Sequence, residues 1–340
     1  MQQFLTELLE CPACHGALDW RIESSVSDQI EQGEAICDLC EAIYPIRDGI
    51  GIFLTADLPR EDLWDQVETS LTAALRNDPE VYSRLMDSPF EDLSPTDQKF
   101  RAMALEESGD FEAARQADQD SNFNLYTPEY MACWTSQIDF VLDRLSQTDG
   151  PVVDLASGRA YLAEKIIAGS DRPVVVTDFS LQVLRRNRKY FDYLGIYLKA
   201  SLLAFDARRT PFKDASIEVM TSNLGLPNIH ESEALPSELA RIVDGELLAI
   251  SHFYPPHDLP NQDLINAAGL KRMLNQESAV RSFEAAGWHI TLENLCSSRA
   301  LPTPGSTILE GARADGLPAA PTELRWAVVH GKTDPPESGQ

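Results

Sequence analysis

Residues 151–161 read PVVDLASGRAY, an apolar run that ends in small residues and a glycine, Gly158. The run predicts a buried strand, and the apolar side chains of Leu162, Ile166 and Ile167 predict a helix directly after the turn. In a doubly wound α/β fold, a nucleotide binds where such a strand turns into a helix. This stretch therefore predicts the fold class and the position of a cofactor site.

Strand signals separated by helix-length segments continue along the chain, at residues 174–178, 199–204, 217–221, 247–251, 289–295 and 324–330. The alternation predicts an α/β fold with a doubly wound sheet over residues 126–333. Residues 56–125 are acidic and helical in pattern, which is typical of a linker or a lid. We expect residues 1–55 to form a small separate unit and residues 334–340 to be a disordered tail.

Four of the six cysteines form two Cys-x-x-Cys pairs, Cys11 with Cys14 and Cys37 with Cys40. Zinc binds four thiolates tetrahedrally, and each Cys-x-x-Cys turn holds two sulfur atoms at a suitable separation. A redox dithiol is the alternative interpretation of such a pair. Four thiolates leave no coordination position open, so we expect a structural Zn²⁺ rather than a catalytic one.

The second cysteine pair is followed by YPIRDGI at residues 44–50, which predicts a strand, a tight turn and another strand. Together with CPAC at 11–14 and CDLC at 37–40, this segment resembles the small zinc-ribbon proteins that activate tRNA, rRNA and release-factor methyltransferases. The resemblance covers residues 1–55. It implies that this unit stabilises an enzyme fused behind it and helps with substrate.

Residues 153–161 resemble the first motif of the Rossmann-like methyltransferases that use S-adenosylmethionine, in which an aspartate opens a D-x-G-x-G-x-G pattern. Gly158 keeps the central glycine, whereas Ala156 and Ala160 replace the outer two. A nicotinamide-binding fold would need G-x-G-x-x-G, and the aligned positions hold Ala156, Gly158 and Tyr161. The pattern therefore favours a methyltransferase over an oxidoreductase.

Three further motifs follow in the order that this family shows: Asp178 at the end of the second strand, Asp206 after the third, and PFKDASI at residues 211–217. The resemblance implies a mostly parallel sheet whose last strand is antiparallel, and S-adenosylmethionine as the cofactor. Asp178 is implied to accept both ribose hydroxyls, and Asp206 to bind the adenine amino group. The cofactor-binding residues expected from the motifs are Asp154, Ala156, Ser157, Gly158, Asp178, Phe179, Asp206, Ala207 and Asn223.

Acceptors in such sheets bind at the carboxyl ends of the strands, beside the cofactor. Two loops reach that edge, residues 222–228 after the fourth strand and residues 252–257 after the fifth. A general base matters only if the acceptor must lose a proton. The candidate bases or substrate contacts on these loops are His230, His252, Tyr254 and His257.

The chain carries 28 Lys and Arg against 54 Asp and Glu, a net charge of −26. Such a surface repels phosphate backbones, and the one concentrated basic run is RRNRK at residues 185–189. That run is either a solvated helix face or a phosphate-binding patch. We therefore favour a small-molecule substrate. An RNA or protein substrate recognised with help from the ribbon, and a non-catalytic cofactor-binding protein, are the alternatives.

No segment approaches the roughly 18 apolar residues that a membrane span needs. The start, MQQF, lacks the order of basic and then apolar residues typical of a signal peptide. We expect a cytoplasmic protein without membrane association.

Overall fold

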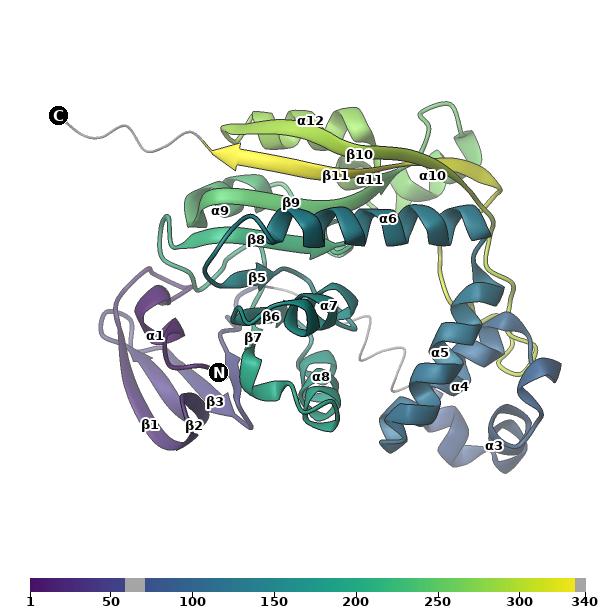
Figure 1. Ribbon diagram of the computed structural model, residues 1–340, viewed down its shortest axis with the longest axis horizontal. Helices are drawn as coiled ribbons and strands as arrows, with labels where there is room; N and C mark the ends of the chain where they lie inside the picture. Colours follow the sequence, from purple (N-terminus) through teal and green to yellow (C-terminus); the bar gives the residue numbers. More distant parts are fainter. Residues whose placement is uncertain (59–70, 334–340) are drawn as a thin grey trace.

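One 11-stranded sheet organises the computed structural model, which describes residues 1–58 and 71–333 (Figure 1). The strand order is β1-β2-β3-β4-β7-β6-β5-β8-β9-β11-β10. The α/β part of this sheet consists of β5 (Val152–Asp154), β6 (Val174–Asp178), β7 (Ala200–Ala204), β8 (Ile217–Asn223), β9 (Val243–Phe253), β10 (Trp288–Ala300) and β11 (Thr322–Thr333).

The strands from β7 to β9 pair in parallel, whereas β11 runs antiparallel to both β9 and β10. Every residue of β5, β6 and β7 is buried, as expected for parallel strands that are covered on both faces. The predicted fold class, a mostly parallel sheet with an antiparallel last strand, is confirmed. The order of the strands along the sheet reverses beside β5, between β5 and β8. In such sheets, ligands bind at this point, in a crevice outside the carboxyl ends of the strands.

Helices cover both faces of the sheet because successive side chains of a strand point to opposite sides. One face packs against α6 (Pro128–Leu145), α7 (Tyr161–Gly169) and α8 (Leu181–Tyr193), with side chains such as Val152, Val174 and Val176. The other face packs against α9 (Leu235–Ile242) and α12 (Gln276–Glu284), with Val153 and Val175. Helices α10 (Leu259–Ala267) and α11 (Lys271–Leu274) follow β9.

The N-terminal residues form α1 (Leu5–Leu8), β1 (Leu18–Val26), β2 (Gln29–Cys37), β3 (Ile43–Arg47) and β4 (Ile50–Ile52). The turn between β3 and β4 places Asp48 and Gly49 at φ angles of 51° and 75°, the backbone of a two-residue hairpin. Strand β4 pairs in parallel with β7, from Ile50 beside Leu202 to Ile52 beside Ala204. The N-terminal unit therefore extends the sheet of the α/β unit instead of standing apart from it.

Helices α3 (Pro79–Met86), α4 (Pro95–Ser108) and α5 (Phe111–Leu125) lie at one end of the molecule, away from most of the sheet (Figure 1). The hydroxyl of Ser94 accepts a hydrogen bond from the backbone amide of Asp97 at 3.2 Å and caps α4. A separate apolar cluster forms between these helices and the connection from β10 to β11, through Phe100 and Ile308. We call residues 71–125 and 303–312 together the cap.

The division of the chain into domains at residues 55 and 125 stays a prediction. Strands from both sides of residue 55, β1 to β4 before it and β5 to β11 after it, belong to the same sheet. The predicted tail at residues 334–340 lies outside the described residues, as do residues 59–70. Within the described ranges, no helix is long and apolar enough to cross a membrane.

Candidate functional site

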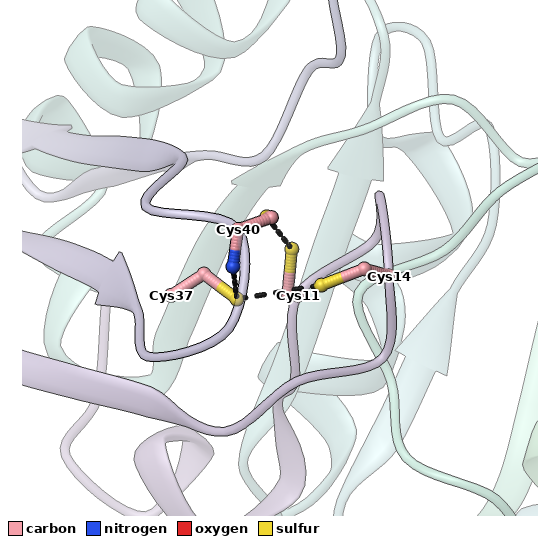
Figure 2. Close-up of side chains that lie close together, drawn as sticks. All are labelled: Cys11, Cys14, Cys37 and Cys40. Carbon is pink, nitrogen blue, oxygen red and sulfur yellow. Dashed lines mark hydrogen bonds between the residues drawn. The ribbon is translucent and has the colours of Figure 1, made fainter.

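The four cysteines of the two pairs lie together between the N-terminal turns (Figure 2). Their sulfur atoms all lie within 4.8 Å of one another, with 3.6 Å between Cys11 and Cys40 and 3.4 Å between Cys14 and Cys37. Each pair begins a turn with the same backbone pattern. The amide of His15 donates to the carbonyl of Cys11 at 2.8 Å, and the amide of Glu41 donates to the carbonyl of Cys37 at 3.0 Å.

This arrangement fits a tetrahedral zinc ion. With Zn–S bonds of about 2.3 Å, the edge of the sulfur tetrahedron is about 3.8 Å, close to the separations above. Burial would raise the pKa of the Cys37 thiol, but the backbone amides of Cys40 and Leu39, each 3.4 Å from its sulfur, lower it to about 7. A Cβ atom on Gly16 would lie 2.8 Å from the Cys37 sulfur and 3.3 Å from that of Cys14, so only glycine leaves the cluster its space.

The histidine beside the cluster and the two remaining cysteines have other partners or places in the fold. The imidazole of His15 is 2.6 Å from Glu10, and its side chain is 52% exposed. Cys133 on α6 donates to the carbonyl of Ser297 at 3.5 Å, and Cys296 lies on β10.

The turn after β5 adopts the backbone of a glycine-rich loop although it contains only one glycine. Ala156, Gly158 and Ala160 have φ angles of 50°, 50° and 58°, all in the left-handed region. A non-glycine residue in that region costs of order 1–3 kcal/mol, and such strain clusters at functional sites. All three positions that align with glycines of the motif therefore have a backbone conformation that favours glycine.

Asp178, at the end of β6, is tied to this loop. The amide of Gly158 donates to its Oδ2 at 3.0 Å, and the amide of Ser180 donates to its Oδ1 at 2.9 Å. Asp178 is only 6% exposed, so its carboxylate is buried beside the turn after β5. Phe179 follows it and is half-buried.

Asp154, at the end of β5, is fully enclosed. Burial raises the pKa of its carboxyl to about 6. The hydroxyl of Thr221 donates a hydrogen bond to Oδ1 at 2.8 Å, which lowers the pKa but by less than burial raises it. Oδ2 is buried and has no hydrogen-bond partner among the described residues. The hydroxyl of Ser157 donates to the carbonyl of Asp154 at 2.7 Å, which ties the loop to the strand end.

Asp206 is already engaged. Both of its oxygens accept from the guanidinium of Arg208, at 2.9 and 2.7 Å, and its Oδ1 also accepts from the amide of Arg208 at 2.9 Å. Ala207 beside it is buried. Asn223, at the end of β8, accepts from the indole N–H of Trp134 at 3.0 Å. These residues follow parallel strands, so they lie along the same edge of the sheet as Asp154 and Asp178.

The four candidate acceptor-site residues fall into two groups. His230 and His257 are exposed, whereas His252 is half-buried and Tyr254 is buried. The ring of His252 lies 5.8 Å from that of Tyr254 and 5.1 Å from that of Trp326. Burial lowers the pKa of His252 to about 4, so its imidazole is neutral at physiological pH, and its Nδ1 has no hydrogen-bond partner among the described residues.

Sequence reasoning missed a largely buried polar network between the cap and the loop after β5. Arg159 lies 2.6 Å from Glu106 on α4 and 3.5 Å from Asp118 on α5. Asp118 also accepts from Lys99 at 2.6 Å and from the hydroxyl of Tyr161 at 2.7 Å. Burial alone would raise the pKa of Asp118, but Arg159 and Lys99 lower it to about 2. No local signal marks these residues, because each contact joins segments far apart in the sequence.

The carboxyl group of Asp315, from the connection between β10 and β11, lies near several aromatic side chains. Asp315 accepts from the hydroxyl of Tyr126 at 2.8 Å, and burial raises the pKa of Asp315. The ring of Tyr126 stacks on that of Tyr130 at 4.8 Å, and Tyr130 meets Trp326 edge-on at 4.9 Å. The rings of Tyr130, Tyr254 and Trp326 thus lie around His252, and the carboxyl group of Asp315 acts electrostatically on two of them, Tyr130 and Tyr254.

The basic run at residues 185–189 is largely used inside the protein. Arg186 is buried and lies 3.6 Å from Glu106. The guanidinium of Arg188 lies 3.3 Å from the centre of the Tyr197 ring. Of the cations in the run, only Arg185 and Lys189 are exposed. Of the four cations in this run, a phosphate-binding patch could therefore use only Arg185 and Lys189.

Comparison with known proteins adds two relationships. Residues 2–49 match the family described as Trm112p-like protein. The demethylmenaquinone methyltransferase of Streptomyces avermitilis is 34% identical over 106 residues, which are 31% of this chain and 43% of that protein. The ubiquinone/menaquinone biosynthesis C-methyltransferase UbiE of Shewanella halifaxensis is 28% identical over 112 residues, 32% of this chain and 45% of that protein. The chain thus spans less than half the length of these curated relatives.

Two solved structures are also similar. The YcgJ protein from Bacillus subtilis aligns with a TM-score of 0.45 and 14% identity, over 58% of this chain and 98% of that one. The geranyl diphosphate C-methyltransferase from Streptomyces coelicolor A3(2) aligns with a TM-score of 0.44 and 15% identity, over 59% of this chain and 80% of that one. The chain is therefore similar to the Trm112p-like family over residues 2–49 and to methyltransferases of quinone biosynthesis over about a third of its length.

Proposed function

We propose that this protein is an S-adenosylmethionine-dependent methyltransferase. The observation that carries the proposal is the loop after β5, which keeps left-handed backbone at Ala156, Gly158 and Ala160 and binds Asp178 through an amide. Local similarity to two methyltransferases supports it.

The residues of this edge suit the parts of the cofactor. Asp178 is assigned to the ribose hydroxyls, because each of the two oxygens of a carboxylate can accept a hydrogen bond from a hydroxyl. Oδ2 of Asp154 is a buried acceptor without a partner among the described residues, which suits a donor of the cofactor. Asp206 and Ala207 are assigned to adenine, where Arg208 already uses both oxygens of the carboxylate. Bound S-adenosylmethionine supplies an electrophilic methyl group.

The protein's own task is then to orient the acceptor and to exclude water. Positioning of two reactants can supply about 7–11 kcal/mol of the barrier. His252 is neutral and can accept a proton or a hydrogen bond through Nδ1. Tyr254 provides a further polar group beside it, and the pKa of its hydroxyl is raised by burial and by the nearby carboxyl group of Asp315. His230 and His257 are exposed and remain weaker candidates for contact with substrate.

For the acceptor we propose a small molecule. The names of the relatives refer to demethylmenaquinone and to ubiquinone and menaquinone biosynthesis, and aromatic side chains lie around His252. The basic run offers only Arg185 and Lys189 to a phosphate backbone, on a chain of net charge −26. An RNA or protein acceptor is the second candidate, favoured by the Trm112p-like segment.

For the N-terminal unit we propose a structural Zn²⁺ bound by Cys11, Cys14, Cys37 and Cys40. Such an ion joins the two cysteine turns and leaves no position for a substrate. Because β4 pairs with β7, an ordered ribbon also protects the edge of the α/β sheet.

The test is incubation of the purified protein with S-adenosylmethionine labelled in its methyl group and a cell extract separated into protein, RNA and small-molecule fractions. The expected result is label in a small molecule other than the added cofactor. The Asp178→Ala variant serves as the inactive control. Label in RNA or protein would replace the small-molecule proposal by the second candidate. Cofactor binding without label in any fraction would contradict a methyltransferase and favour a non-catalytic role.

A further inference from the structure

The cap is one packed body built from two distant parts of the chain. Its apolar cluster joins Leu85 and Phe100 to Ile308 from the connection between β10 and β11. Polar contacts reinforce it, since the carboxylate of Asp97 accepts from the amide of Thr307 at 3.0 Å and from its hydroxyl at 2.7 Å. The parts of the cap are therefore expected to move together.

Where the cap meets the cofactor loop, the contacts are ionic and buried. Glu106 on α4 lies 2.6 Å from Arg159 and 3.6 Å from Arg186, and Asp118 on α5 lies 3.5 Å from Arg159. The side chains of Glu106, Asp118 and Arg159 are each only 10% exposed. Two carboxylates of the cap thus converge on a single guanidinium of the loop.

Arg159 stands inside the loop assigned to the cofactor. Its neighbour Gly158 donates through its amide to Asp178 at 3.0 Å and accepts through its carbonyl from Asn187 at 2.9 Å. A ligand that changes the geometry of the loop therefore changes the position of the guanidinium that holds the cap.

We propose that Glu106, Asp118 and Arg159 form a latch between the cap and the cofactor loop, so that cofactor binding and cap closure favour one another. This inference rests on the proposed function. Arg159 is a positioning residue, which acts through the cap and not on the reacting atoms.

The physical basis is the cost of an uncompensated buried charge. Opening of the cap separates two carboxylates from their guanidinium, and each of these charges that is still shielded from water is then left without its partner, which is unfavourable. A cofactor that orders the loop in its latched form therefore also stabilises the closed cap. By thermodynamic linkage, closure of the cap raises the affinity for the cofactor by the same factor.

The experiment compares hydrogen–deuterium exchange of α4 and α5, with and without S-adenosylhomocysteine, and measures the affinity for this ligand by calorimetry. The variants are Glu106→Gln and Arg159→Gln, with Arg159→Lys to restore the charge. Glu107→Gln is the matched control, because Glu107 is exposed and hydrogen-bonds Thr72 within the cap.

In the wild type, the ligand is expected to slow exchange in α4 and α5 as well as in the loop. Without ligand, Glu106→Gln and Arg159→Gln should speed exchange in these helices about tenfold and weaken ligand binding about tenfold, whereas Glu107→Gln should match the wild type. Arg159→Lys should recover part of both effects. Glu106 is decisive, since it lies on α4 and has no assigned contact with the cofactor.

Wild-type exchange rates and affinity in Glu106→Gln would overturn the latch. Ligand that protects the loop but leaves exchange in α4 and α5 unchanged would overturn the coupling, while the proposed function stands. A wild-type protein that binds no S-adenosylhomocysteine would overturn the proposed function and the coupling with it. In that case the ligand-free exchange rates still decide whether the latch holds the cap.

Discussion

Replacement of Asp178 by asparagine tests the cofactor site at the residue with the clearest geometry. In the folded protein, Oδ1 accepts from the amide of Ser180 at 2.9 Å and Oδ2 from the amide of Gly158 at 3.0 Å. Asparagine keeps the volume of the side chain but offers only one acceptor oxygen. Whichever oxygen is lost, an NH₂ group replaces it, so one backbone amide or one ribose hydroxyl loses its acceptor, and the remaining oxygen accepts as a neutral amide.

A hydrogen bond to a charged group contributes about 1.5–3 kcal/mol. Loss of one such bond should therefore raise the Kd for S-adenosylhomocysteine by about 10- to 150-fold. Asp178→Ala removes both acceptors and should weaken binding at least as much. Asp206→Asn should have the smaller effect, because only one contact to the adenine amino group is lost.

The assay is titration calorimetry at neutral pH, combined with urea unfolding of each variant to separate loss of binding from loss of folding. Asp171→Asn is the control, since its carboxylate is fully exposed and pairs with Lys199. The control should bind like the wild type. An unchanged Kd in the folded Asp178→Asn variant, with normal binding by the wild type, would refute the assignment of the cofactor to this edge of the sheet.

Three further predictions follow from other parts of the molecule. Purified protein should contain one zinc ion per chain, and Cys37→Ser should lose it and lower the Tm; metal analysis that finds no zinc in the wild type would contradict the ribbon. The pKa of His330 is raised, first by its hydrogen bond to Glu246, so its stabilising effect is fully present below the unfolded pKa of about 6.5 and is lost as pH rises through the higher folded pKa. The difference in free energy of unfolding between wild type and His330→Gln, measured in urea, should therefore shrink with rising pH; a constant difference would speak against this pair. Finally, tRNA and rRNA fragments should bind weakly at low salt, and tight binding that disappears when Arg185 and Lys189 are both changed to alanine would replace the small-molecule acceptor by RNA.

The predicted strands agree well with the structure because each one depends on a run of neighbouring apolar residues. Residues 174–178 match β6 as predicted, and residues 217–221 lie within β8. Buried parallel strands need continuous apolar runs, and such runs are visible in the sequence without knowledge of the partner strand. Strand ends were less accurate, since β9 begins at Val243 and ends at Phe253 while the prediction was 247–251.

The roles of charged residues could not be predicted in the same way. The basic run at 185–189 has the pattern of a solvated helix face, yet Arg186 is buried against Glu106 and Arg188 packs on Tyr197. Periodicity along a helix tells which residues share a face, but it does not tell which distant residue covers that face. The same limit applies to the two histidines predicted for the loop after the fifth strand, because His252 lies on β9 itself and is half-buried, whereas His257 lies in the loop and is exposed.

The strand and helix pattern, the two cysteine turns and the aspartates at the strand ends are readable from the sequence alone, because each of these depends on residues a few positions apart. Long-range packing sets three other features: the pairing of β4 with β7, the contact of the cap with the loop after β5 through Arg159, and the place of Asp315 beside aromatic side chains. Glu106 and Arg159 are 53 residues apart, and nothing in the local sequence around either one specifies the other. The compact packing of the chain brings such pairs together, and the cost of burying a charge without a partner keeps them paired.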